Sequence, residues 1–210
     1  MSTGPRAALL ATLATLSMLV LILHAGLPML TALDVAVALQ KADPGRPLPH
    51  GCNSAMLTSA EQPLGSFDGR TWGYGYAQAQ TILCAMEANG GEGKRMYLDR
   101  HFPLDIVFPL LYGPALAMLF LYLVGYYGWR GRALRYFALV PIAAALFDLA
   151  ENTAVRLLVL AGPPPDAGLV TIASTLTVIK SALGWLSLIV TLGLLLWYLV
   201  TRSLSRDPAA

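Results

Sequence analysis

Four long apolar runs constrain this chain more than any other feature of its sequence. A helix that crosses the hydrocarbon core of a bilayer needs about 20 mostly apolar residues. Each run meets this length, and the four cover residues 8–30, 102–127, 133–160 and 169–200. The sequence therefore predicts an all-α integral membrane protein whose four transmembrane spans form a helix bundle.

The composition excludes the other common classes of protein. Charged residues make up 12% of the chain, against roughly 25% in an ordinary soluble domain. A mean hydropathy of +0.61 would leave large apolar patches exposed in a soluble protein of this size, and it is too high for a disordered chain. The formal net charge of +2 gives no basic surface of the kind that binds nucleic acid. We therefore expect the lipid bilayer as a partner, and no nucleic acid.

Arginine residues in the short connections predict the orientation, because positively charged loops tend to remain in the cytoplasm. The connection between the second and third runs contains Arg130, Arg132 and Arg135, whereas residues 161–168, between the third and fourth, contain no Lys or Arg. The arginines that flank the first and last runs agree with this pattern, and they are Arg6, Arg202 and Arg206. We expect both termini on the cytoplasmic side of the plasma (inner) membrane.

These boundaries divide the chain into four parts. Residues 1–32 are expected to form the first span, residues 33–101 an external or periplasmic subdomain, residues 102–201 a three-span bundle and residues 202–210 a cytoplasmic tail. The first span also fits a second interpretation, since Arg6 and the apolar run after it match the start of a signal peptide. The length of the run and the lack of a clean small-x-small site favour an uncleaved anchor, whereas cleavage would leave three spans.

The external segment is expected to combine an irregular loop with short helices. Prolines and glycines interrupt residues 43–72 repeatedly, which is typical of a loop. Residues 74–88 return to helical periodicity, and the Asn-Gly-Gly run at residues 89–91 is a glycine-type helix end. A second short helix is expected from Glu92 into Pro103 and the membrane.

Both cysteines of the chain, Cys52 and Cys84, fall in this external segment. An oxidising compartment would allow them to form a disulfide, and the alternative is two unpaired thiols. The two cysteines form no CxxC motif, so a redox-active pair is not indicated. We expect a structural disulfide between the proline-rich loop and the helix that follows it.

Charged side chains within the third apolar run are the most informative feature for function. Asp148, Asn152 and Arg156 are spaced four residues apart and Glu151 follows Asp148 by three, so all four are expected along one helix face. A charge at the centre of a span is costly, and several on one stripe require partners inside the bundle. The stripe therefore indicates a ligand or substrate site, a lock on helix packing, or a proton or ion pathway.

The fourth run supplies the candidate partner Lys180. If residues 161–168 form a tight turn, Lys180 lies at the same depth as Asp148 and Glu151 on the facing helix. The carboxyl groups outnumber the bases at this depth, and Asp148 and Glu151 are the pair expected to share a proton. A protonatable carboxyl beside a lysine can act as an acid or a base, so these three residues are the candidate catalytic residues.

The same depth matching brings in the second span, where Asp105 is level with Arg156 and Tyr112 is level with Asp148. Trp185 follows Lys180 by five residues and is expected inside the bundle. The candidate ligand-binding residues are Asp105, Tyr112, Asn152, Arg156 and Trp185.

Neither a metal nor a cofactor is indicated by a motif. His50 and His101 fall in the external segment, where no cysteine or carboxylate is recognised at ligand spacing around them, so a metal site is not expected. The chain contains no glycine-rich phosphate loop, GxSxG elbow or HExxH motif. The cofactor, if any, is unknown from the sequence.

Three functions are compatible with these features. The first is binding of an amphiphile, lipid or isoprenoid in a buried polar cavity, and the second is intramembrane acid/base catalysis, such as isomerisation or proton transfer, on such a molecule. The third is an accessory or assembly subunit of a larger membrane complex, without catalysis. In architecture the chain resembles the small four-span emopamil-binding and sterol-isomerase group, whose members place acidic residues and a Trp in a membrane cavity. No motif specific to that group is present, so its functional residues cannot be carried over.

Overall fold

The computed structural model describes residues 30–43, 45, 47–60, 64–127 and 135–204. The described residues form helices and loops, with no strand among them. The chain is therefore all-α in this part, as the sequence predicts. A helical segment covers residues 30–42, and the elements after it are α2 (Ser54–Thr58), α3 (Tyr76–Met96), the π-helix η1 (Tyr97–His101), α4 (Phe102–Tyr126), α6 (Leu139–Ala161) and α7 (Ala167–Leu204).

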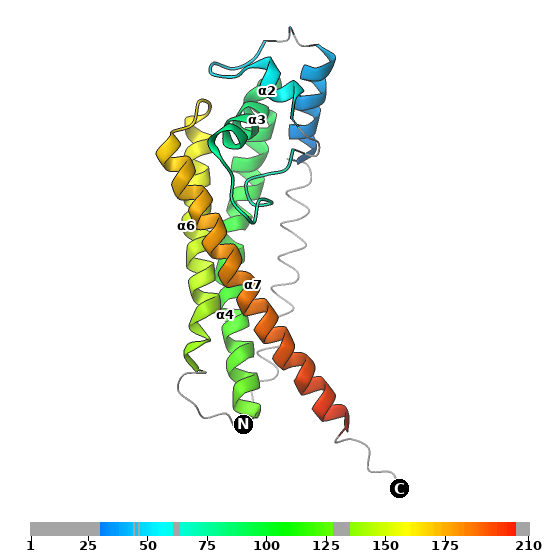
Figure 1. Cartoon of the computed structure of the whole chain (residues 1–210), viewed down its shortest axis with the longest axis vertical. Helices are drawn as coiled ribbons and strands as arrows, with labels where there is room; N and C mark the ends of the chain where they lie inside the picture. The colour runs from blue at the N-terminus through cyan, green and yellow to red at the C-terminus, as the bar shows by residue number, and fades with distance from the viewer. Residues whose placement is uncertain (1–29, 44, 46, 61–63, 128–134, 205–210) are drawn as a thin grey trace.

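Three long helices form an elongated bundle, and the remaining elements form a cap at one end of it (Figure 1). Helix α6 packs against both α4 and α7, and α7 crosses the other two at a slant. The cap consists of the segment 30–42, α2, α3 and the loops between them. The bundle therefore presents one capped end and one end where α7 diverges from its neighbours.

Two helical stretches are long and apolar enough to cross a membrane, Tyr76–Tyr126 and Ala167–Thr201. Helix α4 supplies the apolar part of the first stretch, and α7 makes up the second. Helix α6 lies between them and carries three charged residues, at positions 148, 151 and 156. The predicted first span and most of the arginine-rich connection fall in residues 1–29 and 128–134, outside the described residues.

The helix end predicted at residues 89–91 is confirmed. The backbone leaves helical geometry at Ala88 (ψ 165°), and Asn89, Gly90 and Gly91 take positive φ values of 53°, 72° and 72°. Asn and Gly adopt this left-handed conformation at low cost. The helix then resumes and runs through η1 into α4 without a break, as the sequence predicts from Glu92 to Pro103.

A disulfide joins Cys52 to Cys84, with 5.7 Å between the Cα atoms, so the predicted pairing is confirmed. The bond attaches the loop before α2 to the middle of α3. Around it lies a buried apolar core that continues into the cap-side ends of the bundle helices. Its fully buried members include Leu33, Leu57, Phe67, Ile82, Leu83, Val155 and Leu158.

Helices α4 and α6 approach each other closely because one contact position on α4 is glycine. A Cβ atom added at Gly113 would lie 2.7 Å from the Ala145 Cβ and 3.2 Å from the Pro141 carbonyl oxygen. Small residues at such positions allow membrane helices to come into close contact. This contact sets how near the start of α4 can come to the charged face of α6.

We expect Gly113→Ala to destabilise the protein by about 1–3 kcal/mol, because the added methyl group overpacks the α4–α6 contact. Thermal or denaturant unfolding in detergent measures this change. Gly125→Ala is the matched control, since a Cβ at Gly125, on the same helix, meets no atom within 4 Å. The control should leave stability unchanged or raise it by up to about 1 kcal/mol through helix propensity. Equal effects of the two substitutions would contradict the close contact.

Candidate functional site

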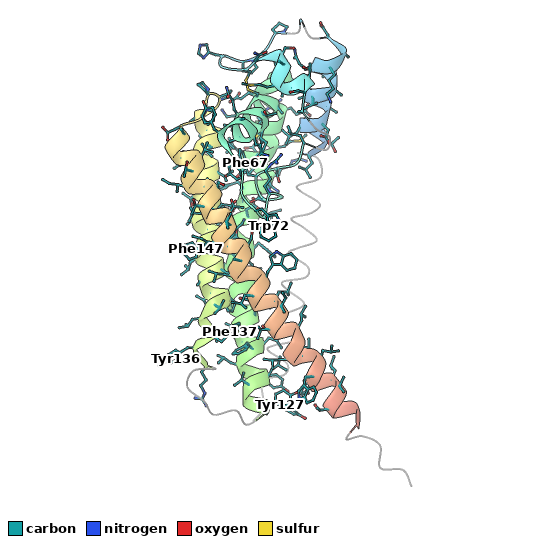
Figure 2. The ribbon with its side chains drawn as sticks, in the orientation of Figure 1. Phe67, Trp72, Tyr127, Tyr136, Phe137 and Phe147 are labelled. Carbon is teal, nitrogen blue, oxygen red and sulfur yellow. A yellow bond between two sulfur atoms is a disulfide. The ribbon has the colours of Figure 1, made fainter. Side chains whose placement is uncertain are left out.

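A loop of the cap, residues 64–75, descends along α7 and covers the middle of the bundle (Figure 1). Figure 2 shows Phe67 within the cap and Trp72 lower down, beside α7. The Tyr74 N–H donates a hydrogen bond to the Ser174 Oγ of α7 at 2.9 Å. Gly73 (φ 84°) permits this contact, because a Cβ there would lie 2.7 Å from the same oxygen. The attachment brings Asp68 of the loop over the charged face of α6 and α7.

Lys180 of α7 lies at the centre of the charged residues. Its Nζ donates to the Asp148 Oδ1 at 2.9 Å, forms an ion pair with Glu151 and lies 3.5 Å from the Asp68 Oδ1. The Lys180 side chain is 14% exposed. One ammonium group therefore connects α7, α6 and the cap loop.

The carboxyl groups of α6 are held by further hydrogen bonds. Glu151 is fully buried, and its Oε1 accepts a hydrogen bond of 2.7 Å from the Thr177 Oγ1. The Asn152 Nδ2 donates to the Asp148 Oδ1 at 3.3 Å and to the backbone oxygen of Asp105 at 2.8 Å. Asn152 thereby connects the charged residues of α6 to the first turn of α4.

His101 and Asp105 extend the charged group to the entrance of α4. The His101 Nε2 lies 3.3 Å from the Asp68 Oδ2 and 3.2 Å from the Asp105 Oδ2. His101 is the last residue of the π-turn η1, in which the Phe102 N–H bonds to the Tyr97 oxygen. Pro103 follows and has no N–H for the regular helical pattern, which accounts for a wide turn at this point. Turns of this kind recur at functional sites.

We call this group the polar cluster. It contains seven residues, which come from the cap loop, η1, α4, α6 and α7: Asp68, His101, Asp105, Asp148, Glu151, Asn152 and Lys180.

Acidic groups exceed basic groups in the polar cluster. Four carboxyl groups face one ammonium and one imidazole. Burial acts to raise the pKa of Asp68, but the positive charge of Lys180 and the hydrogen bond with His101 together lower that pKa to about 2. Asp68 is therefore an anion at neutral pH. Burying a charge without a partner is costly, so the excess of carboxyls favours binding of a proton or a cation.

An apolar groove of about 360 Å³ lies between the cap loop and α7. It is lined by Thr71, Trp72, Val178, Ser181, Ala182 and Trp185. Trp72 belongs to the same loop as Asp68, and Ser181 follows Lys180 directly. A larger pocket of about 560 Å³ lies in the cap between α2 and α3, and it contains none of the polar-cluster residues.

The structure brings the three candidate catalytic residues together. Lys180 contacts both Asp148 and Glu151, so the depth matching of α6 and α7 is confirmed. Tyr112 of α4 is half-buried, and its hydroxyl interacts electrostatically with Asp148. The catalytic and binding roles of these residues stay predictions.

The structure does not join Arg156 to the polar cluster, although the sequence predicts Arg156 and Asp105 at the same depth. Arg156 is exposed and its guanidinium lies over the Phe102 ring, 4.7 Å from the centroid, while Asp105 faces His101. Positions four residues apart drift round a helix by about 40°. Arg156, eight residues after Asp148, is therefore about 80° away from it and points out of the bundle.

The expected location of Trp185 inside the bundle is wrong. Trp185 is 57% exposed and lines the groove with Trp72. Five residues correspond to about 140° round a helix, so Lys180 and Trp185 point to different sides of α7.

Two members of the polar cluster, Asp68 and His101, are not among the candidate residues that the sequence indicates. His101 and Asp105 are four residues apart, which places them on one helix face, so the run HFPLD contained a usable signal. No local signal marks Asp68, because its partners lie far away in the sequence and the loop that holds it is irregular. Ligand atoms of Asp68, His101 and Asp105 lie within 4.8 Å of one another and could hold a metal ion.

Comparison of the chain with protein-family models, curated proteins and solved structures gives no match. The geometry of the polar cluster and its groove is therefore the basis for any functional conclusion.

We expect Lys180→Met to destabilise the protein by about 3–5 kcal/mol, because it leaves buried carboxylates without their cation. Adding Asp148→Asn should restore part of this loss, and the double-mutant cycle in bicelles measures the coupling. Lys94→Met is the control. Lys94 pairs with Glu87 in the partly exposed cap, so its loss should cost about 1 kcal/mol or less. If the stability losses of Lys180→Met and Asp148→Asn simply add in the double mutant, an energetically coupled ion pair between the two residues is contradicted.

Proposed function

We propose that the chain is a four-span membrane protein that binds an amphiphile, a lipid or isoprenoid, between its polar cluster and the adjoining groove. One observation carries this proposal: the same short stretch of α7 bears the polar cluster on one side and an apolar groove on another, and the cap loop reaches both through Asp68 and Trp72. The apolar part of the ligand would lie between Trp72 and Trp185, and its head group would reach the polar cluster beside Lys180.

The four-span arrangement rests on the helices and on the apolar runs together. Helices α4 and α7 each have the length and apolarity of a span, and α6 packs against both of them with Asp148 and Glu151 turned toward Lys180 of α7. Large apolar side chains on the outside of the bundle, such as Leu146, Leu157 and Leu196, are 51–64% exposed. A lipid environment would cover these side chains, and residues 8–30 would supply the remaining span.

The charge of the cluster restricts the head group. The ammonium of Lys180 is already shared among three carboxyl groups, so little of its charge is left for an anionic ligand. Excess carboxyl groups instead favour a head group that donates hydrogen bonds. The proposed ligand therefore carries a hydroxyl or an amine rather than a phosphate alone.

Acid/base catalysis on the same ligand is the second candidate. The supporting observation is that Asp148 and Glu151 share a single lysine, so one of them can keep a proton. A protonated carboxyl beside a carboxylate is an arrangement that serves proton transfer. Turnover that is lost in Asp148→Asn or Glu151→Gln while binding persists would favour this candidate over binding alone.

The proposed topology predicts where two reporters are active. A reporter fused after Gly131, in the arginine-rich connection, should report the cytoplasm, and one inserted at Pro164 should report the exterior, because positively charged loops stay inside. Paired cytoplasmic and periplasmic reporters measure this directly. Reversed signals would contradict the orientation, and equal signals at both sites would contradict the crossing by α6.

The proposed ligand should be detected by native mass spectrometry of gently extracted protein. We expect a bound lipid-sized molecule on the wild type and its loss in Trp185→Ala, since removal of the ring opens the groove. Trp197→Ala is the matched control, because Trp197 lies on the same helix and is equally exposed, at 57%.

Retention of the same adduct in Trp185→Ala would contradict binding in the groove. A co-purified protein subunit, with no small molecule on the wild type, would instead favour the accessory-subunit interpretation.

A further inference from the structure

Three potential metal ligands converge at the junction of the cap loop, η1 and α4. The His101 Nε2 faces one oxygen of Asp68 at 3.3 Å and one oxygen of Asp105 at 3.2 Å. We propose that these three residues bind a divalent transition-metal ion, with Zn²⁺ as the expected occupant. This inference goes beyond the proposed function and does not rest on it.

The polar atoms at this point are not satisfied by one another. The His101 Nε2 carries at most one hydrogen, so it can donate to only one of the two carboxylate oxygens that face it. The Asp105 side chain is only 9% exposed. Its Oδ2 is buried and forms no hydrogen bond with any of the described residues. Each buried polar group without a partner costs about 1–3 kcal/mol. A cation between the three atoms would satisfy all of them.

The distances are compatible with metal coordination as well as with one weak hydrogen bond. Charge-assisted N–H···O bonds are about 2.7–2.9 Å long, and both contacts of the His101 Nε2 are longer. Ligand atoms held at about 2.0–2.1 Å from a tetrahedral zinc ion lie about 3.3 Å from one another. All three ligand atoms lie within 4.8 Å of one another, so a small movement of one carboxylate completes the set.

The ligands are oriented by residues outside the set, as in known metal sites. Asp68 directs its Oδ2 to His101 and its Oδ1 to the Lys180 Nζ. The backbone oxygen of Asp105 accepts the hydrogen bond from Asn152, which fixes the first turn of α4. Lys180 and Asn152 therefore hold two of the three ligands in place.

The charge of the polar cluster and the type of donor atoms favour this class of ion. Two carboxylates and a neutral imidazole carry two negative charges, which a divalent ion balances. An imidazole nitrogen favours zinc and related ions over magnesium and calcium, which prefer oxygen. Three protein ligands leave a fourth position open, which is typical of zinc sites that bind water or a substrate.

The test measures metal in the full-length protein, purified in detergent without chelators. Elemental mass spectrometry should find close to one zinc ion per chain. After removal of zinc with EDTA, added Zn²⁺ should raise the melting temperature, and added Co²⁺ should give the visible absorption of a low-coordinate cobalt site. Substoichiometric zinc together with no cobalt spectrum in the wild type would overturn the proposal, and this outcome depends on no variant.

Variants assign the site to these residues. His101→Gln and Asp68→Asn should weaken Zn²⁺ binding more than about 100-fold, since loss of even an outer-shell partner costs about 10–100-fold. The matched controls are His50→Gln and Asp99→Asn, which change exposed residues of the same types and should retain the metal.

Unchanged zinc binding in a folded His101→Gln protein would also overturn the proposal. So would a nuclear magnetic resonance signal of doubly protonated His101 that persists in excess Zn²⁺, because the histidine would then be an ion-pair partner of the two aspartates. None of these readouts depends on lipid binding, so the failure of this inference is distinguishable from failure of the proposed function.

Discussion

The buried ammonium of Lys180 is the interaction on which the rest of the structure depends. An ammonium group placed among apolar helices is stable only when carboxylates surround it, and Asp148, Glu151 and Asp68 do so. Two of these partners fix the register of α6 against α7, and the third fixes the cap loop over both helices. A slip of either helix by one turn would separate the charges, so this group determines one arrangement out of several that apolar packing alone would allow.

Close contact between α4 and α6 extends this arrangement to a third helix. The glycine at position 113 removes the side chain that would hold the two helices apart, and Asn152 reaches the backbone oxygen of Asp105 as a result. The π-turn before α4 then directs His101 toward the same centre. Packing of small residues and hydrogen bonding of polar residues therefore act together, and neither would place Asp105 and His101 at the cluster without the other.

The ion pairs of Lys180 also give α7 two different sides, a polar one toward α6 and an apolar one toward the groove. Its inner side carries Thr177 and Lys180, which bond to α6, while Trp185 and its neighbours leave an apolar groove on another side. The cap loop contributes to both sides, through Asp68 and Trp72. A polar centre and an apolar surface thus lie within two turns of one helix, and this arrangement is the physical basis of the proposal that an amphiphile binds here.

Features of local origin were determined by the sequence alone. The lengths of the apolar runs determined α4, α6 and α7, the Asn-Gly-Gly run determined the end within α3, and a short proline-rich turn determined that Lys180 faces Asp148 and Glu151. The tertiary structure decided the features that depend on contacts between residues distant in the sequence and on the direction in which each side chain leaves its helix. Asp68 lies 112 residues from Lys180, in a loop without periodicity, so only folding of the cap could bring it there. Arg156 and Trp185 point away from the polar cluster because 3.6 residues per turn rotate a side chain steadily round the helix, and residue spacing along a stripe does not reveal which neighbour covers each side.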